Sequence, residues 1–82
     1  MSTPFTMEWL IITEGREKRV NEGDNLFEIA YEGYKLFPIN EPLEIRKHFS
    51  SKVIGSCVIE ELILKNQATH CKYRLISLNS VN

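Results

Sequence analysis

The sequence has 82 residues, with 10 Lys and Arg against 11 Asp and Glu and a pI near 6.1. This length predicts a single domain over residues 1–82, and the near-balanced charge disfavours a dedicated nucleic-acid-binding protein, which is usually strongly basic. A hydrophobic fraction of 43% is typical of a folded chain and not of a disordered one.

The first predicted strand covers residues 5–13, where Phe5, Met7, Trp9 and Ile11 occupy alternate positions. The apolar run at 9–12 is too short for the hydrophobic core of a signal peptide or for a membrane-spanning helix. We therefore expect a cytoplasmic protein without a membrane segment.

Polar turns delimit the next elements. Residues 14–16 form a predicted turn, and residues 18–20 follow as a short, charged edge strand of the kind that resists edge-to-edge association. Residues 21–25 form a second polar turn.

A hairpin is predicted over residues 26–38, with its tip at Glu32-Gly33, because glycine adopts positive φ readily. A two-residue loop would place Ile29 opposite Leu36 and Tyr31 opposite Tyr34. Residues 43–49 are ambiguous, since they alternate like a strand although Pro42 also suits the first turn of a short helix. We favour a short strand or an irregular crossover.

The last third predicts a second hairpin, with strands at 53–64 and 69–78 joined by residues 65–68. If Leu64 pairs with Thr69, Val58 lies opposite Leu75 on one face. On the other face of this hairpin, Ile59 lies opposite Arg74 and Glu61 opposite Lys72. Gly55 marks a bulge or a close backbone approach.

Together these elements predict an all-β fold. We expect a small antiparallel sheet of five or six strands, curled into a partly open barrel. The expected core consists of apolar residues on one face of the strands: Trp9, Phe27, Ile29, Tyr34, Leu36, Val58, Leu62, Tyr73 and Leu75.

Few residues suggest catalysis or metal binding. The two cysteines, Cys57 and Cys71, lack the C-x₂₋₄-C spacing of a zinc site, and the predicted register places them on opposite faces, which excludes a disulfide. His70 points away from Cys71 because neighbours on a strand alternate, and His48 has no partner motif. We expect no metal, no cofactor and no enzymatic activity.

Charge is unevenly distributed along the chain. Residues 1–41 hold eight acids and four bases, whereas residues 42–82 hold three acids and six bases. A patch of Arg46, Lys47, Lys72 and Arg74 would support weak single-stranded nucleic-acid binding, as in small barrels that combine a basic face with aromatic residues. The simpler interpretation is that Glu61 pairs with Lys72 and that the other charges are solvated.

Residues 20–30 resemble the opening of a LysM peptidoglycan-binding module, in which a Gly-Asp turn precedes Leu and then Ile-Ala on a helix. Gly23-Asp24, Leu26 and Ile29-Ala30 carry the likeness. It implies LysM-like glycan binding as a further alternative. A polar turn followed by a strand is the preferred interpretation, because prolines interrupt the region of the module's second helix.

Three stretches, at residues 10–17, 33–47 and 73–82, resemble a small bacterial family. They read LIITEGRE, GYKLFPINEPLEIRK and YRLISLNSVN. The family belongs to spore-forming Gram-positive bacteria and is described as a domain of unknown function. The resemblance spans essentially the whole chain and implies a compact, mostly β domain in a bacterial cytoplasm. It assigns no catalytic or binding residue, and it does not require Cys57 or Cys71.

The leading functional hypothesis is a non-enzymatic interaction module that binds another protein or a second copy of itself. The strands carry apolar residues on both faces, so some must remain outside the core. We expect an exposed surface of Leu26, Phe37, Ile59 and Ile63, since contiguous exposed apolar surface usually marks a contact.

Overall fold

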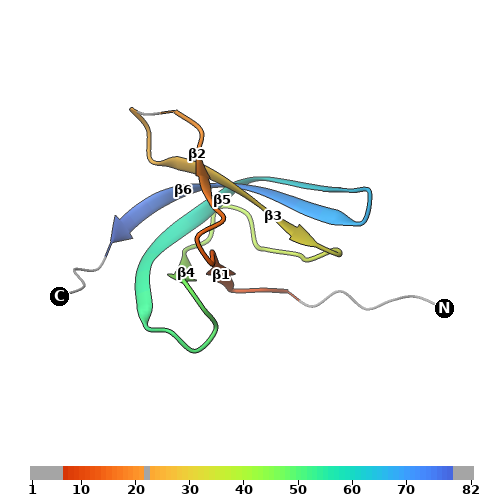
Figure 1. Ribbon diagram of the computed structural model, residues 1–82. Helices are drawn as coiled ribbons and strands as arrows, with labels where there is room; N and C mark the ends of the chain where they lie inside the picture. Colours follow the sequence, from red (N-terminus) through yellow and green to blue (C-terminus); the bar gives the residue numbers. More distant parts are fainter. Residues whose placement is uncertain (1–6, 22, 79–82) are drawn as a thin grey trace.

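The computed structural model describes residues 7–21 and 23–78, which form an all-β fold without a helix in that part of the chain (Figure 1). Its strands are β1 (Leu10–Ile12), β2 (Lys18–Arg19), β3 (Leu26–Glu32), β4 (Leu43–Arg46), β5 (Val53–Lys65) and β6 (Ala68–Leu78). The ambiguous segment after Pro42 is therefore a strand, and the charged strand at 18–20 is confirmed in shorter form.

All six strands belong to one sheet, in the order β1-β4-β5-β6-β3-β2. The prediction of a purely antiparallel sheet is wrong at one position, because β1 pairs with β4 in parallel, Ile11 lying opposite Ile45. The other ladders between the six strands are antiparallel, so the sheet is mixed. β1 and β2 remain the two edges, and within the described residues no ladder joins them into a closed barrel.

The β5–β6 hairpin is the part of the fold that the sequence predicts best. Asn66 and Gln67 form its two-residue turn, and both have positive φ, 52° and 60°. The predicted register holds from the turn inward, with Leu64 opposite Thr69, Leu62 opposite Cys71 and Glu61 opposite Lys72.

A bulge at Glu60 shifts the pairing of residues 57–59 by one residue, until a second shift between Ser56 and Cys57 restores the predicted register. Ile59 lies opposite Tyr73, and Val58, not Ile59, lies opposite Arg74. A one-residue shift moves side chains to the other face of a strand, so Ile59 points into the core and is fully buried. The predicted opposition of Val58 to Leu75 is wrong for the same reason.

The predicted hairpin over residues 26–38 does not form. β3 pairs instead with β6 and, over Phe27 and Glu28, with β2. Gly33 does turn the chain with a positive φ of 78°. The segment that follows crosses the end of the sheet, where Leu36 forms a bridge with Met7 and Ile39 forms one with Ile59.

The core lies inside the bend of the sheet. Figure 1 shows β5 curving strongly, so that β4 and β1 lie below β3 and β6. Ile29 and Tyr73 are buried as predicted, and Phe27 packs against this core with its ring stacked on Tyr73 at 5.6 Å. Leu62 and Leu75 also pack against it, while Leu36 and Val58 are half-buried.

Two predicted core aromatics, Trp9 and Tyr34, are exposed instead. Phe37, which the sequence placed outside, fills the core in their stead and lies against Tyr31 with ring centroids 5.8 Å apart. The exchange follows from the loss of the 26–38 hairpin, because a crossing segment turns Phe37, and not Tyr34, toward the inside of the sheet.

Candidate functional site

The predicted interaction surface of Leu26, Phe37, Ile59 and Ile63 does not exist as a unit. Phe37 and Ile59 are buried, at 4% and 0% exposure, and Leu26 is half-buried. Ile63 is exposed as predicted and lies on β5. The prediction from the sequence is wrong because the Glu60 bulge turns Ile59 inward and the crossing segment turns Phe37 inward.

Four other exposed apolar side chains lie on two neighbouring segments at one end of the sheet. Met7 forms a bridge with Leu36, and the amide of Glu8 donates to the Leu36 carbonyl at 2.7 Å. These contacts bring Met7 and Trp9 alongside the segment that carries Tyr34 and Ile39. We call these four exposed residues, Met7, Trp9, Tyr34 and Ile39, the apolar end surface.

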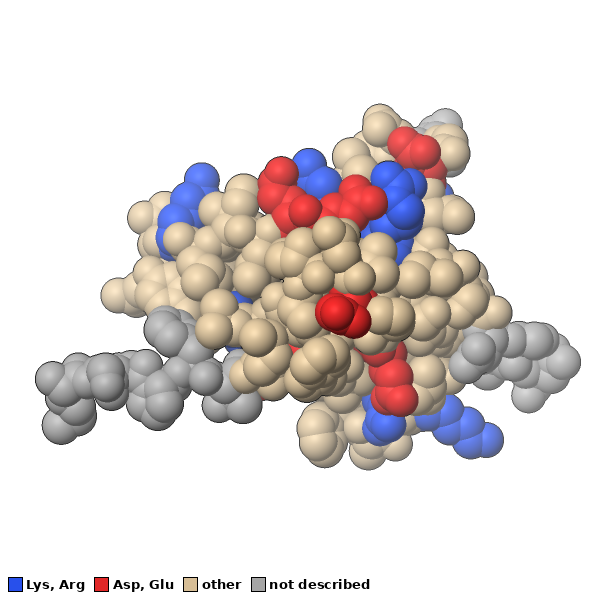
Figure 2. Space-filling model, turned by 180° about the vertical axis from the view of Figure 1, so that it is seen from behind, with Lys and Arg blue, Asp and Glu red and all other residues tan. Residues whose placement is uncertain are grey.

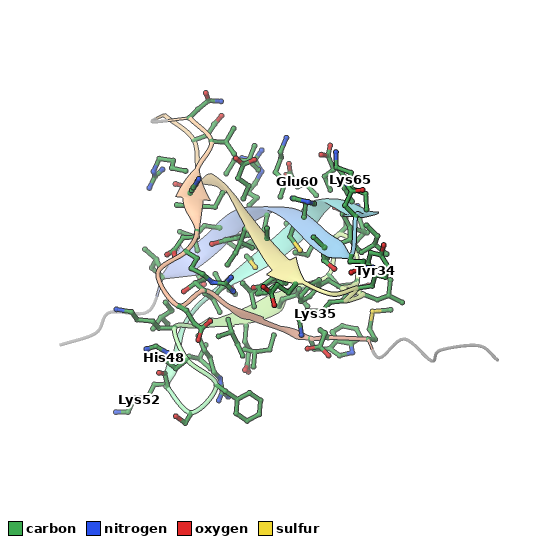
Figure 3. All side chains as sticks on the ribbon, turned by 45° about the vertical axis from the view of Figure 1, so that its right-hand side comes forward. Tyr34, Lys35, His48, Lys52, Glu60 and Lys65 are labelled. Carbon is green, nitrogen blue, oxygen red and sulfur yellow. The ribbon has the colours of Figure 1, made fainter. Side chains whose placement is uncertain are left out.

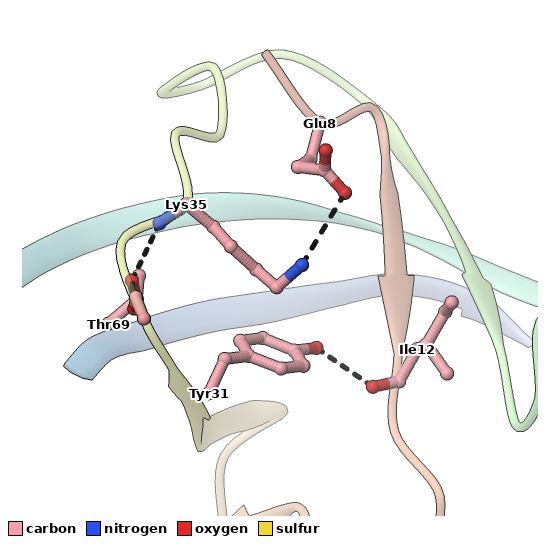
Figure 4. A network of polar contacts seen from close by, with 6 residues as sticks. Glu8, Ile12, Tyr31, Lys35 and Thr69 are labelled. Atoms are coloured by element: carbon pink, nitrogen blue, oxygen red, sulfur yellow. Dashed lines mark hydrogen bonds and ion pairs between the residues drawn. The ribbon is translucent and has the colours of Figure 1, made fainter. Parts of the chain in front are cut away.

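Polar contacts hold the two segments in place (Figure 4). The Lys35 ammonium lies 3.9 Å from the Glu8 carboxylate and 5.9 Å from the centroid of the Tyr31 ring. The Lys35 amide donates to the Thr69 hydroxyl, which donates in turn to the Gly33 carbonyl. The Tyr31 hydroxyl donates to the Ile12 carbonyl at 2.9 Å, linking β3 to β1. The backbone under the apolar end surface is therefore tied to the core.

Opposite charges alternate across the outer face of the sheet. In register, Lys18 of β2 lies beside Glu28 of β3, Glu28 beside Lys72 of β6, and Lys72 beside Glu61 of β5. The Lys72 ammonium is 4.0 Å from the Glu61 carboxylate, which confirms the pair predicted from the sequence. We call Lys18, Glu28, Lys72 and Glu61 the charge row.

The charge row crosses a shallow hollow of about 550 Å³ on this outer face. Ala30, Ile63 and His70 also line the hollow, as do Arg16 and Lys65. Because carboxylates alternate with the cations, the hollow lacks the uniform positive charge that would select a phosphate.

The predicted basic patch is divided between two places. Arg46 lies on β4 beside Glu44, at 3.4 Å, and Lys47 follows it. Lys72 and Arg74 lie on β6, which is separated from β4 by β5, and Arg74 pairs with Glu60 at 2.6 Å. This contact raises the pKa of Arg74. Figure 2 shows Lys and Arg side chains at separate margins of the face opposite to that in Figure 1, interspersed with acids.

A further hydrophobic side chain is exposed near basic residues on the turn between β4 and β5. Phe49 is 76% exposed, and its carbonyl accepts a bond from the Arg46 guanidinium at 3.1 Å. Lys47, His48 and Lys52 are also exposed on this turn. Phe49 provides a control position for tests of the apolar end surface.

Both cysteines are free, buried and on the core face of the sheet. The prediction that they face opposite sides is wrong, because the Glu60 bulge inverts the alternation between them. Burial raises the pKa of each thiol to about 12, and the neighbouring Cys71 adds to the rise at Cys57. Such thiols are protonated near neutral pH and are poor nucleophiles.

Burial also raises the pKa values of Tyr31 and Tyr73, so their phenols stay neutral. Over residues 7–21 and 23–78, no three His, Cys, Asp or Glu side chains come together as a metal-ligand group. The described part of the chain likewise contains no helix able to cross a membrane.

The segment that resembles LysM forms a turn followed by strand β3. Ile29 and Ala30, which the module would place on a helix, lie in the middle of that strand. The preferred interpretation of the sequence, a polar turn before a strand, is therefore confirmed.

Comparison with known proteins identifies the family. The chain is 33% identical over 82 residues to the uncharacterized protein YtmB of Bacillus subtilis strain 168, and the match covers 100% of both chains. The X-ray crystal structure of YtmB matches the fold with a TM-score of 0.88, covering 100% of this chain and 99% of that one. The family model described as "Domain of unknown function (DUF2584)" matches residues 1–82, and the chain belongs to this family, as its resemblance predicted.

Proposed function

We propose that the protein is a non-enzymatic interaction module that binds another protein through the apolar end surface. The observation that carries this proposal is the position of Trp9, the only tryptophan of the chain, which is 57% exposed beside exposed Met7. Tryptophan and tyrosine are enriched where protein partners bind, and Tyr34 belongs to the same surface. A cytoplasmic location remains a prediction from the sequence.

The fold supports this proposal because its core is complete without these side chains. Phe37, Tyr31 and Ile59 fill the inside of the bend, so nothing in the packing requires Trp9 to be a large aromatic residue. Burying an exposed apolar side chain of this size against a partner contributes about 1.5–3 kcal/mol. The neighbouring Glu8 and Lys35 pair gives the surface a polar rim.

The absence of enzymatic activity is part of the proposal. Its support is the state of the candidate nucleophiles, since Cys57 and Cys71 are buried thiols with pKa values of about 12. His70 is exposed on the outer face of β6, whereas Cys71 points to the core face, so this imidazole is not placed to act as a base for the thiol.

The test compares three tagged full-length chains used for capture from an extract of bacterial cytoplasm: wild type, Trp9→Lys and Phe49→Lys. Phe49 is the matched control, because it is another exposed aromatic residue remote in sequence from the apolar end surface. We expect a protein that wild type and Phe49→Lys retain and Trp9→Lys loses. Once purified, that protein should shift the Trp9 fluorescence of wild type to shorter wavelength.

Two results would contradict this proposal. One is retention of the same proteins by all three chains, and the other is a wild type that retains nothing above an untagged control. Circular dichroism spectra should be the same for the three chains, since both substituted side chains are exposed.

Single-stranded nucleic-acid binding through Arg46, Lys47, Lys72 and Arg74 remains an alternative without a specific observation in its favour. Three of these cations lie beside carboxylates, at 3.4, 4.0 and 2.6 Å, so binding a phosphate backbone would compete with existing pairs. This alternative requires an affinity that falls steeply as salt is added.

We also infer that the bent sheet has the shape of a partly open barrel. The Tyr31 hydroxyl and the Ile12 carbonyl link β3 to β1 across the bend, where no ladder joins the two strands. Within the described residues, the crossing segment that contains Phe37 covers one end of such a barrel, next to the apolar end surface.

A further inference from the structure

β5 extends well beyond the strand beside it. It has 13 residues, whereas β4 has four and pairs only with the stretch from Val53 to Cys57. Ile39 forms a single bridge with Ile59, and past that point no described strand follows this edge of β5. Figure 3 shows Glu60 and Lys65 along the outer margin of the molecule, at the two ends of the open stretch.

The register identifies which backbone groups are available on this edge. In a hairpin with a two-residue turn, the residues that flank the turn form a hydrogen-bonded pair, here Lys65 and Ala68. Hydrogen-bonded and non-hydrogen-bonded pairs alternate in an antiparallel ladder. Leu62 and Leu64 therefore direct their N–H and C=O groups away from β6, toward the open edge.

The side chains of the open stretch are apolar in its middle and charged at its ends. Ile63 is 39% exposed and Leu64 38% exposed. The five residues read Glu61-Leu62-Ile63-Leu64-Lys65, with a carboxylate at one end and an ammonium at the other. Reversed and laid beside itself, this segment places Glu opposite Lys, Leu opposite Leu, and Ile opposite Ile.

We propose that two copies of the protein associate by antiparallel pairing of this edge, with the two-fold axis at Ile63. Leu62 of one copy would form a hydrogen-bonded pair with Leu64 of the other, and Ile63 would face Ile63 in a non-hydrogen-bonded pair. The proposal goes beyond the apolar end surface, because it uses a different segment and names the partner as a second copy.

Two independent features agree with this register. The backbone groups that point outward belong to Leu62 and Leu64, which are the residues this pairing requires to be hydrogen-bonded. The charges also match, because Glu61 of each copy lies opposite Lys65 of the other. Charged residues on an edge strand usually prevent association, but here their opposite signs favour the symmetric register and disfavour a shifted one.

The association is expected to be weak and dependent on concentration, because the paired stretch is short. Neighbouring opposite charges in a sheet contribute about 0.2–1 kcal/mol each, and the interface is smaller than that of an obligate dimer. In sedimentation velocity, wild type should change from monomer to dimer between micromolar and millimolar concentration.

Disulfide cross-linking tests the register directly. Ile63→Cys places a thiol at the two-fold axis, where facing Cα atoms in a non-hydrogen-bonded pair lie about 4.5 Å apart, within the range for a disulfide. Lys65→Cys is the matched control, because that position faces Glu61 of the second copy and not itself. With oxidised glutathione as oxidant, Ile63→Cys should form covalent dimers at least tenfold faster than Lys65→Cys.

The native thiols should not interfere with this cross-linking experiment, because Cys57 and Cys71 are buried. Equal cross-linking rates for the two variants would overturn the proposed register. A wild type that stays monomeric up to millimolar concentration would overturn the association itself.

Charge exchange provides a second test that does not depend on thiols. In a dimer of Glu61→Lys, a lysine at position 61 of each copy faces Lys65 of the other. In a dimer of Lys65→Glu, a glutamate at position 65 of each copy faces Glu61 of the other. Each variant should therefore dimerise at least tenfold more weakly than wild type. A mixture of the two variants restores both opposite-charge pairs and should recover the affinity. A mixture that associates no better than either variant alone would contradict the proposal.

A third pair of variants separates this inference from the proposed function. Ile63→Lys should abolish dimers, whereas Ile76→Lys, the same change at an exposed position near the other end of the hairpin, should not. Trp9→Lys should leave the dimer intact. Loss of dimers in Trp9→Lys, or their persistence in Ile63→Lys, would show that the β5 edge is not the interface.

Discussion

The two buried cysteines show how environment decides what a side chain can do. A thiol near the protein surface is partly ionised at neutral pH, but Cys57 and Cys71 lie in the core beside Ile59 and Tyr73, where a charge has no solvation. With pKa values of about 12, both thiols stay protonated near neutral pH and serve to pack the core. Free cysteine of this kind behaves as a small hydrophobic residue.

This burial predicts a loss of stability in alkaline solution. The folded thiols keep their protons up to about pH 12, whereas unfolded thiols ionise near their ordinary value of 9.0, so the unfolded state binds fewer protons above that pH. The free energy of unfolding should be constant from pH 7 to pH 8 and then fall, by up to about 1.4 kcal/mol per pH unit for each thiol.

Urea denaturation between about pH 8 and pH 9 checks this, because unfolded tyrosines, with an ordinary pKa of 10.0, remain mostly protonated in that range. In the double variant Cys57→Ala, Cys71→Ala the slope should largely disappear, although the variant is less stable overall. An equal slope in wild type and the double variant would contradict the assignment to the thiols.

At the scale of elements, β5 determines the shape of the sheet because it pairs on both sides and bends where the register shifts. One shift lies between Ile45 and Arg46 of β4, another between Ser56 and Cys57, and the third at Glu60. Each extra residue increases local bending and twist. Gly55 lies between the first two shifts and is buried against β6.

Gly55→Ala should destabilise the protein, since an added Cβ would collide with the carbonyl oxygen of Ser77. The backbone of β6 cannot move away without breaking the ladder, so we expect a loss of about 1–3 kcal/mol. Gly23→Ala is the matched control, because nothing lies within 4 Å of a Cβ there. Equal midpoints of urea unfolding for the two variants would refute the close approach.

The elements that the sequence predicted correctly are the local ones. The β5–β6 hairpin can be predicted from the sequence because a short turn joins its two strands. The alternation of each strand and the position of the turn together specify which residues pair. β3 satisfies the same alternation, yet its partner is β6, about 40 residues away, and alternation does not specify a distant partner. The Glu60 bulge is equally hidden, because Glu60 and Glu61 are identical neighbours and either could be the extra residue.

The candidate surfaces were missed for the same reason. Trp9 fits the alternation of a buried strand, yet it is exposed, and the crossing segment supplies Phe37 to the core instead. The open edge of β5 had a weak signal in the sequence, namely a predicted strand at 53–64 much longer than the ambiguous one at 43–49.

At the scale of the whole molecule, the topology mixes charges that the sequence keeps apart. The acidic first half supplies β3, which lies directly between β2 and the β6 strand of the basic second half. Glu28 therefore lies between Lys18 and Lys72, and the segregated charge becomes the alternating charge row. A count along the chain could not predict this, because it depends on which strands become neighbours.

The link between Tyr31 and Ile12 acts at the same scale, since it joins β3 and β1 across the bend at 2.9 Å. Tyr31→Phe should lower the free energy of unfolding by about 0.5–1.5 kcal/mol, the net contribution of such a bond. Tyr34→Phe is the matched control, because its hydroxyl accepts a bond from the Gln67 amide at an exposed position where water can replace it. Equal denaturation midpoints for the two variants would show that the link contributes nothing.

The parallel pairing of β1 with β4 has a consequence for the order in which the chain is assembled. β1 precedes β2 and β3 in the sequence, but its partner follows them, and β4 itself rests on β5. During synthesis β1 therefore stays without a neighbour until the middle of the chain has left the ribosome, and the distant contact it then forms is of the kind that slows folding. The first of the described strands along the chain is thus among the last to find its partner.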